Sequence, residues 1–103
     1  MIVNKIIEAY SKYRQTILDS YENPKYLSVV LLISPKAFNE LISEETIFRD
    51  KFLHYAFICG RRTPIIIKDD LPENVDFVLQ SQADYERQEQ QELFNRFYKM
   101  FGN

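Results

Sequence analysis

The sequence predicts an α+β domain in which three helices accompany a mainly antiparallel sheet of about four strands. Three observations lead to this class. Residues 2–21 have the period of an amphipathic helix, residues 26–80 contain strand-like segments around one short helix, and residues 81–101 form a last helical segment. The order of helix, strand, helix, three strands and helix differs from the regular alternation of a parallel α/β fold. With 103 residues, we expect a single domain over 1–103.

The N-terminal segment has one apolar and one polar face. Apolar residues recur every three or four positions from Ile2 to Tyr21, and Lys5 and Glu8 lie between them. The sequence Glu-Asn-Pro at 22–24 ends this pattern, because proline cannot continue the helical hydrogen bonds. We therefore expect a helix that packs one face on the rest of the domain.

The next segment predicts a buried strand followed by a short helix. Within Tyr26–Ile33, the run Val29–Ile33 is continuously apolar, which is typical of a central strand covered by helices on both faces. Ser34 and Pro35 then match an N-cap and a first helical residue. Residues 43–51 fit either a further helical turn or a loop. The short helix has three apolar residues for its buried face: Phe38, Leu41 and Ile42.

The middle of the chain predicts three more strands. Leu53–Cys59 is apolar on both faces, and Pro64–Lys68 contains three consecutive isoleucines. The turn signal Gly60–Thr63 separates them, so we expect an antiparallel hairpin. A second turn-rich loop at 69–74 precedes the last strand, Val75–Gln80.

The C-terminal segment changes character along its length. Ser81 and Asp84 have the spacing of a capping box, and residues 82–92 are nearly all polar. An aromatic stripe then follows, and it has two alternative explanations. It packs on the first helix and the sheet, or it lies on a helix that extends from the domain and contacts another subunit, since aromatic side chains are frequent interface anchors. The stripe consists of Leu93, Phe94, Phe97, Tyr98 and Phe101.

Composition argues against several classes of partner. The net charge is −2 and the basic residues are scattered, so we expect no nucleic-acid footprint. The longest apolar run, Val29–Ile33, is far shorter than the roughly 20 residues of a membrane span. The chain starts without a secretory signal, and its single cysteine suits a reducing compartment. We expect a soluble, cytoplasmic protein.

No group of residues predicts catalysis. His54 and Cys59 are the only histidine and cysteine, and their spacing places them on opposite faces of one strand. Asp69 and Asp70 are adjacent in a turn, where aspartate is favoured for its local hydrogen bonds. With two glycines in the chain, a phosphate-binding loop is absent from the sequence. We therefore predict that the protein is not an enzyme and has no metal, cofactor or small-molecule substrate.

Arg61 and Arg62 are the remaining candidate site residues. At the tip of the predicted hairpin, they could contact a phosphate or a carboxylate of a partner. The alternative is an ordinary solvated turn, because no aromatic residue is near them in the sequence. With the aromatic stripe, they make up the candidate protein-interaction residues.

Two stretches of the chain resemble part of a known fold. The first, Leu32–Leu41, has the end of a strand, Ser-Pro and a helix with leucine, and the second comprises Gly60, Pro64–Ile67, Asp69–Pro72 and Val75–Leu79. The first resembles an element of tailed-phage major capsid proteins and encapsulins, and the second is similar to their glycine–proline hairpin and following strand. The resemblance covers about residues 27–80 and implies a fold like the axial domain of those proteins. Arg61 and Arg62 depart from it by separating the glycine from the proline.

The expected function follows from these points. The resemblance implies a phage-associated structural, assembly or accessory protein, in the host cytoplasm or the virion, without the parts of a complete capsid subunit. The aromatic stripe favours action through protein–protein contacts, with a homo-oligomer as the first expectation. The alternative is a small inhibitor or adaptor that binds a host protein and is monomeric alone. An enzyme would need a polar pocket joining His54 to acidic residues.

Overall fold

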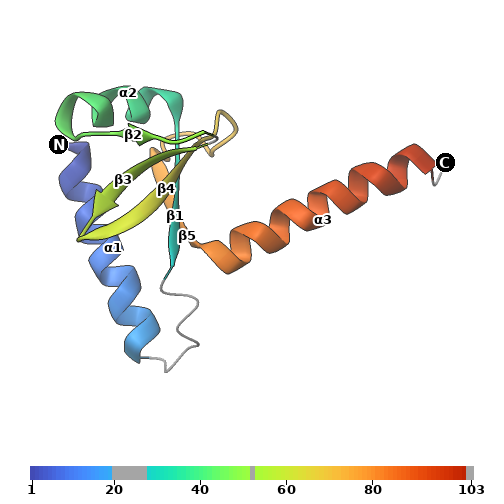
Figure 1. Cartoon of the computed structure of the whole chain (residues 1–103), viewed down its shortest axis with the longest axis horizontal. Helices are drawn as coiled ribbons and strands as arrows, with labels where there is room; N and C mark the ends of the chain where they lie inside the picture. Colours follow the sequence, from blue (N-terminus) through green and yellow to red (C-terminus); the bar gives the residue numbers. More distant parts are fainter. Residues whose placement is uncertain (20–27, 52, 102–103) are drawn as a thin grey trace.

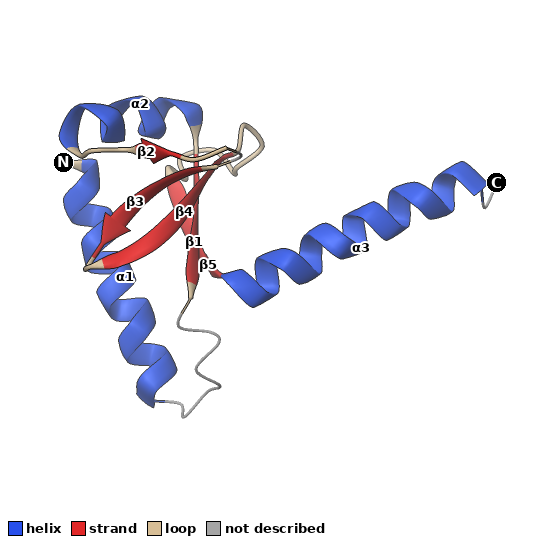
Figure 2. Cartoon of the chain, in the orientation of Figure 1, coloured by secondary structure: helices blue, strands red, loops and turns tan. Residues whose placement is uncertain are grey.

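The computed structural model describes residues 1–19, 28–51 and 53–101, except for the side chain of residue 101. Three helices and a five-stranded mixed sheet make up this part of the chain, so the predicted α+β class is confirmed with one strand more than expected (Figures 1 and 2). The predicted end of the first helix and start of the first strand fall in 20–27, outside the described residues. The elements are α1 (Ile2–Asp19), β1 (Val29–Ile33), α2 (Pro35–Glu44), β2 (Phe48–Arg49), β3 (His54–Ile58), β4 (Arg61–Ile67), β5 (Phe77–Ser81) and α3 (Gln82–Phe101).

The strands follow the order β2-β3-β4-β1-β5. All neighbouring pairs are antiparallel except β1 and β4, which run parallel. The expected mainly antiparallel sheet is therefore present. The additional strand, β2, lies in the segment 43–51 that the sequence left open between helix and loop. It is two residues long, so it has no alternating pattern that the sequence could show. It is a strand because it pairs with His54 and Tyr55 of β3.

The hydrophobic core lies between the sheet and the helices α1 and α2, which pack on the same face. Alternate residues of each strand point into it, as the two-residue period of a strand requires. All five residues of β1 are buried, as expected, but the two helices cover one face of the sheet only. The buried core residues are Ile2, Ile6, Tyr10, Val29, Leu31, Ile33, Ala37, Phe38, Leu41, Ala56, Ile58 and Ile65.

The β3–β4 turn is tighter than the sequence predicts. Ile58 pairs directly with Arg61, so only Cys59 and Gly60 form the connection. Both have positive φ angles, 53° and 77°. Such a two-residue turn matches the right-handed twist of the flanking strands. The expected turn over 60–63 is therefore wrong, and Arg61 and Arg62 belong to the strand.

Polar caps define the helix ends. The N–H of Ala37 donates to Ser34 Oγ (3.2 Å), and Pro35 occupies the first turn of α2, as predicted. The other end of α2 caps a different helix, because the carboxylate of Glu44 accepts the N–H groups of Ile2 (3.2 Å) and Val3 (2.9 Å). This arrangement satisfies two donors at the start of α1 and places a negative charge at the positive end of its dipole.

Candidate protein-interaction surfaces

Helix α3 leaves the domain directly from the sheet. Strand β5 ends at Ser81 and α3 begins at Gln82, without a connecting loop. The N–H of Asp84 donates to Ser81 Oγ (3.1 Å), and the N–H of Gln82 donates to the carbonyl of Ser28 beside β1 (2.8 Å). Ser81 itself is buried. These contacts fix the start of α3, and Figure 1 shows the rest of the helix pointing away from the sheet and the other helices.

The first half of α3 is held by contacts within the helix. Tyr85 Oη donates to a carboxylate oxygen of Glu89 (2.7 Å), and Arg87 forms an ion pair with Asp84. Burial and this hydrogen bond raise the pKa of Tyr85 to about 12, and the charges of Glu89 and Glu92 add to the shift. Residues 83–85 are half-buried where the helix leaves the sheet, and residues 86–92 are exposed.

The aromatic stripe lies on the projecting end of α3. Its described side chains are 61–68% exposed, and Met100 beside them is 76% exposed. The rings of Phe94 and Tyr98 stack at 6.5 Å between centroids. Phe101 lies in α3, but its side chain is outside the described atoms. Of the two alternatives, the structure has the extended helix, and packing on the first helix is excluded for the described side chains. We call the following residues the α3 stripe: Leu93, Phe94, Phe97, Tyr98 and Met100.

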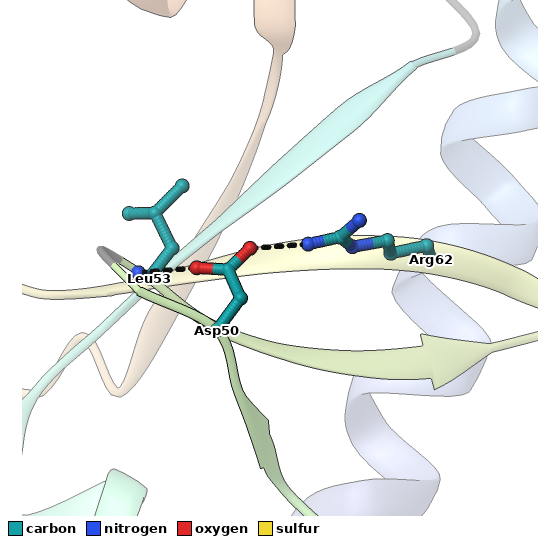
Figure 3. A network of polar contacts seen from close by, with 3 residues as sticks. All are labelled: Asp50, Leu53 and Arg62. Carbon is teal, nitrogen blue, oxygen red and sulfur yellow. Dashed lines mark hydrogen bonds and ion pairs between the residues drawn. The ribbon is translucent and has the colours of Figure 1, made fainter.

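Arg62 lies on the face of the sheet opposite to the core. Its guanidinium pairs with Asp50 (2.5 Å), whose other carboxylate oxygen accepts the N–H of Leu53 (2.9 Å; Figure 3). The guanidinium carbon is also 4.1 Å from the centre of the Tyr55 ring, a cation–π distance. The aromatic platform that the sequence seemed to lack is therefore supplied across the hairpin.

A second exposed aromatic surface surrounds Arg62. Tyr55 pairs with Phe48 on one side, and Phe57 pairs with Arg62 on the other, so these side chains share the outer face of the sheet. Centroid distances among the three rings are 5.4, 5.7 and 5.9 Å. Phe57 is 54% exposed and Phe48 41%. We call Phe48, Tyr55 and Phe57 the sheet patch.

Sequence reasoning missed the sheet patch because cross-strand pairing assembles it. Leu53–Cys59 was expected to be apolar on both faces, which does not distinguish an exposed face from a buried one. One signal was present, namely more aromatic residues than a small core needs. The exposed outer face follows from the placement of α1 and α2 on the same side and from the departure of α3.

Arg61 follows the turn and precedes Arg62 in β4. Both arginines line a surface depression of about 260 Å³ near the start of α3, together with Tyr10, Ser28, Val29 and Gln82. Burial raises the pKa of Tyr10, and the positive charges of Arg61 and Arg14 oppose that shift. The side chains of the two arginines leave opposite faces of β4, because neighbours in a strand alternate, although both residues line this depression.

The residues considered for chemistry are not brought together. The ring of His54 packs edge-on against Phe38 at 5.3 Å, and Cys59 is exposed in the turn at the other end of β3. Among the described residues, no three His, Cys, Asp or Glu side chains are grouped so that they could hold a metal ion. None of the described helices is both long and apolar enough to span a membrane.

Comparisons with known proteins add no relative. No protein-family model matches the chain, and neither the curated proteins nor the solved structures contain a significant match.

Proposed function

We propose that this chain is a non-enzymatic assembly protein that acts through protein–protein contacts and associates with copies of itself through the α3 stripe. The observation that supports this proposal is the position of five large apolar side chains, each more than half exposed, on a helix that projects from the domain. A large exposed apolar surface usually marks an interaction site, because ordinary solvent-exposed helix faces are polar.

The size of the surface is sufficient to drive association. A fully buried aromatic side chain covers about 150–250 Å², so a ring that is two-thirds exposed offers on the order of 100 Å² or more. At about 25 cal/mol per Å², each such ring contributes roughly 2.5 kcal/mol when covered. Several rings together reach the cost of association, about 4–15 kcal/mol. A helix with this surface is therefore expected to be covered in the assembled state.

The phage association rests on the resemblance of residues 27–80 to the axial domain of tailed-phage capsid proteins. It suggests an accessory or assembly role during particle formation, in the host cytoplasm or the virion. Neighbouring genes for a terminase or a portal protein would support this part of the proposal. A chromosomal neighbourhood without phage genes would contradict it and would leave the proposal of self-association intact.

Sedimentation analysis of the purified chain tests self-association directly. We expect a discrete oligomer for the wild type and a monomer for Phe94→Glu and Phe97→Glu, because each places a charge in the α3 stripe. Asn95→Glu is the matched control: it adds the same charge to the same helix, but helical geometry places position 95 on the opposite side. A monomeric wild type, or an oligomer that survives both substitutions, would refute the proposal.

A small adaptor or inhibitor of a host protein is the second candidate. The polar first half of α3 holds the stripe away from the domain, an arrangement that also suits insertion into a groove of a different protein. In that case the chain alone is monomeric. One stoichiometric partner, captured from a host lysate by the wild type and lost with Phe94→Glu, would distinguish this function from self-association.

A further inference from the structure

Within residues 1–19, 28–51 and 53–101, two exposed aromatic surfaces stand out, the α3 stripe and the sheet patch. The stripe is a helix face without a sheet against it, and the patch is a sheet face without a helix against it. We infer that the α3 stripe of one copy packs on the sheet patch of a second copy, in a reciprocal exchange of helices. This inference rests on the proposed self-association and names the surface that accepts the helix. A helix on the open face of a sheet would complete a layer arrangement common in α/β domains.

The helix cannot cover the sheet of its own chain without breaking its start. No residue separates β5 from α3, and the hydrogen bonds of Asp84 and Gln82 hold the first turn in place. Folding α3 back would remove the cap at buried Ser81 and the bond to Ser28. The stripe therefore points to a surface outside its own domain.

The distribution of polar and apolar residues along α3 fits a contact at a distance. At 1.5 Å per residue, the polar segment 82–92 spans about 16 Å, and the stripe from Leu93 to Met100 spans about 10 Å. The sheet patch and its edge at Arg62 extend over the three strands β2, β3 and β4. Neighbouring strands are ~4.8 Å apart, so the width of the patch across the strands is about 10 Å. The solvated half is thus a spacer, and the apolar half has the length of the patch. A helix meant to cover its own sheet would need its apolar residues near the junction instead.

Glu86 and Glu89 of α3 are opposite in charge to Arg62 at the edge of the sheet patch. On a helix, Glu86 and Glu89 lie on the same line as Leu93, seven and four positions earlier. Arg62 borders the sheet patch, and its side chain is 55% exposed although it pairs with Asp50. A guanidinium has five N–H donors, so Arg62 can donate hydrogen bonds to a second carboxylate. A parallel pairing of two α3 helices would instead place Glu86 and Glu89 against their own copies.

The area of contact favours a reciprocal arrangement. One stripe on one patch covers roughly 700–800 Å² in total, which is the size of an ordinary crystal contact. Two symmetric contacts reach roughly 1,500 Å², within the range of a stable specific interface. We therefore expect a closed two-fold dimer rather than an open chain of single contacts.

Two variants separate the helix from its acceptor. The helix variant Phe94→Glu disables the stripe, and the sheet variant Phe57→Glu disables the patch. Each alone is expected to be monomeric at concentrations where the wild type is dimeric. Their mixture has one intact stripe and one intact patch, so it is expected to form a heterodimer that is weaker than the wild-type dimer. The sequence predicted Ile42 on the buried face of α2, but this was wrong, since its side chain is 51% exposed. Ile42→Glu is therefore the control and is expected to remain dimeric.

The outcomes distinguish this inference from the proposed function. A sheet variant that dimerises like the wild type would overturn the exchange and leave self-association through α3 alone. A monomeric wild type would overturn both. Loss of dimer in each variant with recovery in the mixture would support the exchange, and it would also show that both variants fold.

Footprinting of the wild type provides a test that needs no substitution. Hydroxyl-radical labelling of Phe48 and Phe57 is expected to fall as the protein concentration rises through the dimer transition, together with labelling of Phe94. Ile42 serves as the internal reference. Labelling of Phe48 and Phe57 that stays constant while Phe94 becomes protected would refute the sheet patch as the acceptor.

Discussion

The guanidinium of Arg62 lies over the ring of Tyr55 on the neighbouring strand, and the same group pairs with Asp50 from the β2–β3 connection. Three short segments therefore meet at one side chain. Asp50 also accepts the N–H of Leu53, so it holds its own loop while it orients the arginine. This network keeps the side chains at the edge of the sheet patch in fixed positions without covering them.

Replacement of Arg62 should reveal how much this network contributes to stability. We expect Arg62→Ala to lower the free energy of unfolding by about 1 kcal/mol, since both the cation–π contact and the ion pair are partly exposed to solvent. Arg62→Lys should lower the free energy of unfolding by roughly half as much, because lysine keeps the positive charge but not the planar group over the Tyr55 ring. Urea unfolding measures the difference. Arg49→Ala, at another exposed arginine of the sheet, is the control, and an equal loss there would contradict a specific role for Arg62.

The cap of α1 by Glu44 predicts a second measurable effect. Glu44→Gln keeps the length of the side chain, but it removes one acceptor oxygen and the charge that faces the helix dipole. We expect a loss of about 1 kcal/mol in the free energy of unfolding. Glu40→Gln, on the exposed side of the same helix, should change it by much less. Similar losses in both variants would show that the contact of Glu44 with Ile2 and Val3 contributes nothing.

The raised pKa of Tyr85 predicts a loss of stability at high pH. The phenol has a pKa of about 12 in the folded chain, against an ordinary value of 10.0. Between these two pH values the folded state keeps the phenol proton and the unfolded state releases it. The contribution of Tyr85 to the free energy of unfolding is therefore complete below pH 10 and is lost as the pH rises toward about 12.

The variant Tyr85→Phe tests this pH dependence. Its free energy of unfolding should fall less steeply between those values than that of the wild type, as measured by denaturant unfolding at several pH values. Tyr10→Phe is a useful comparison, because burial also raises the pKa of Tyr10. An unchanged slope in Tyr85→Phe would mean that the hydrogen bond to Glu89 does not hold the proton.

The predictable parts of the fold are those that local chemistry determines. Three signals are readable in the sequence because each depends only on residues within one element. They are the period of α1, the Ser34–Pro35 start of α2 and the apolar run of β1. The hairpin was also predictable, but its turn was not. Cys59 adopts a positive φ angle that asparagine or glycine adopts far more readily, and pairing of the flanking strands outweighs this local preference.

The unpredicted parts depend on contacts between distant residues. The strand β2 exists through its partner β3, and the parallel pairing of β1 with β4 joins segments separated by a helix and two strands. The two candidate surfaces also combine features that are local in the sequence with features that depend on distant contacts. The α3 stripe could be found from its helical spacing, whereas its exposure depends on where β5 ends, and the sheet patch depends on a register that the sequence does not display.

The direct junction between Ser81 and Gln82 has a mechanical consequence. With no residues between strand and helix, the direction in which the stripe faces is set by the hydrogen-bond register of the sheet. Each residue inserted there would rotate the stripe by about 100° about the helix axis and advance it by about 1.5 Å. The exposed α3 stripe is thus held in one orientation relative to the sheet, and this orientation limits the geometry of any contact that the stripe makes.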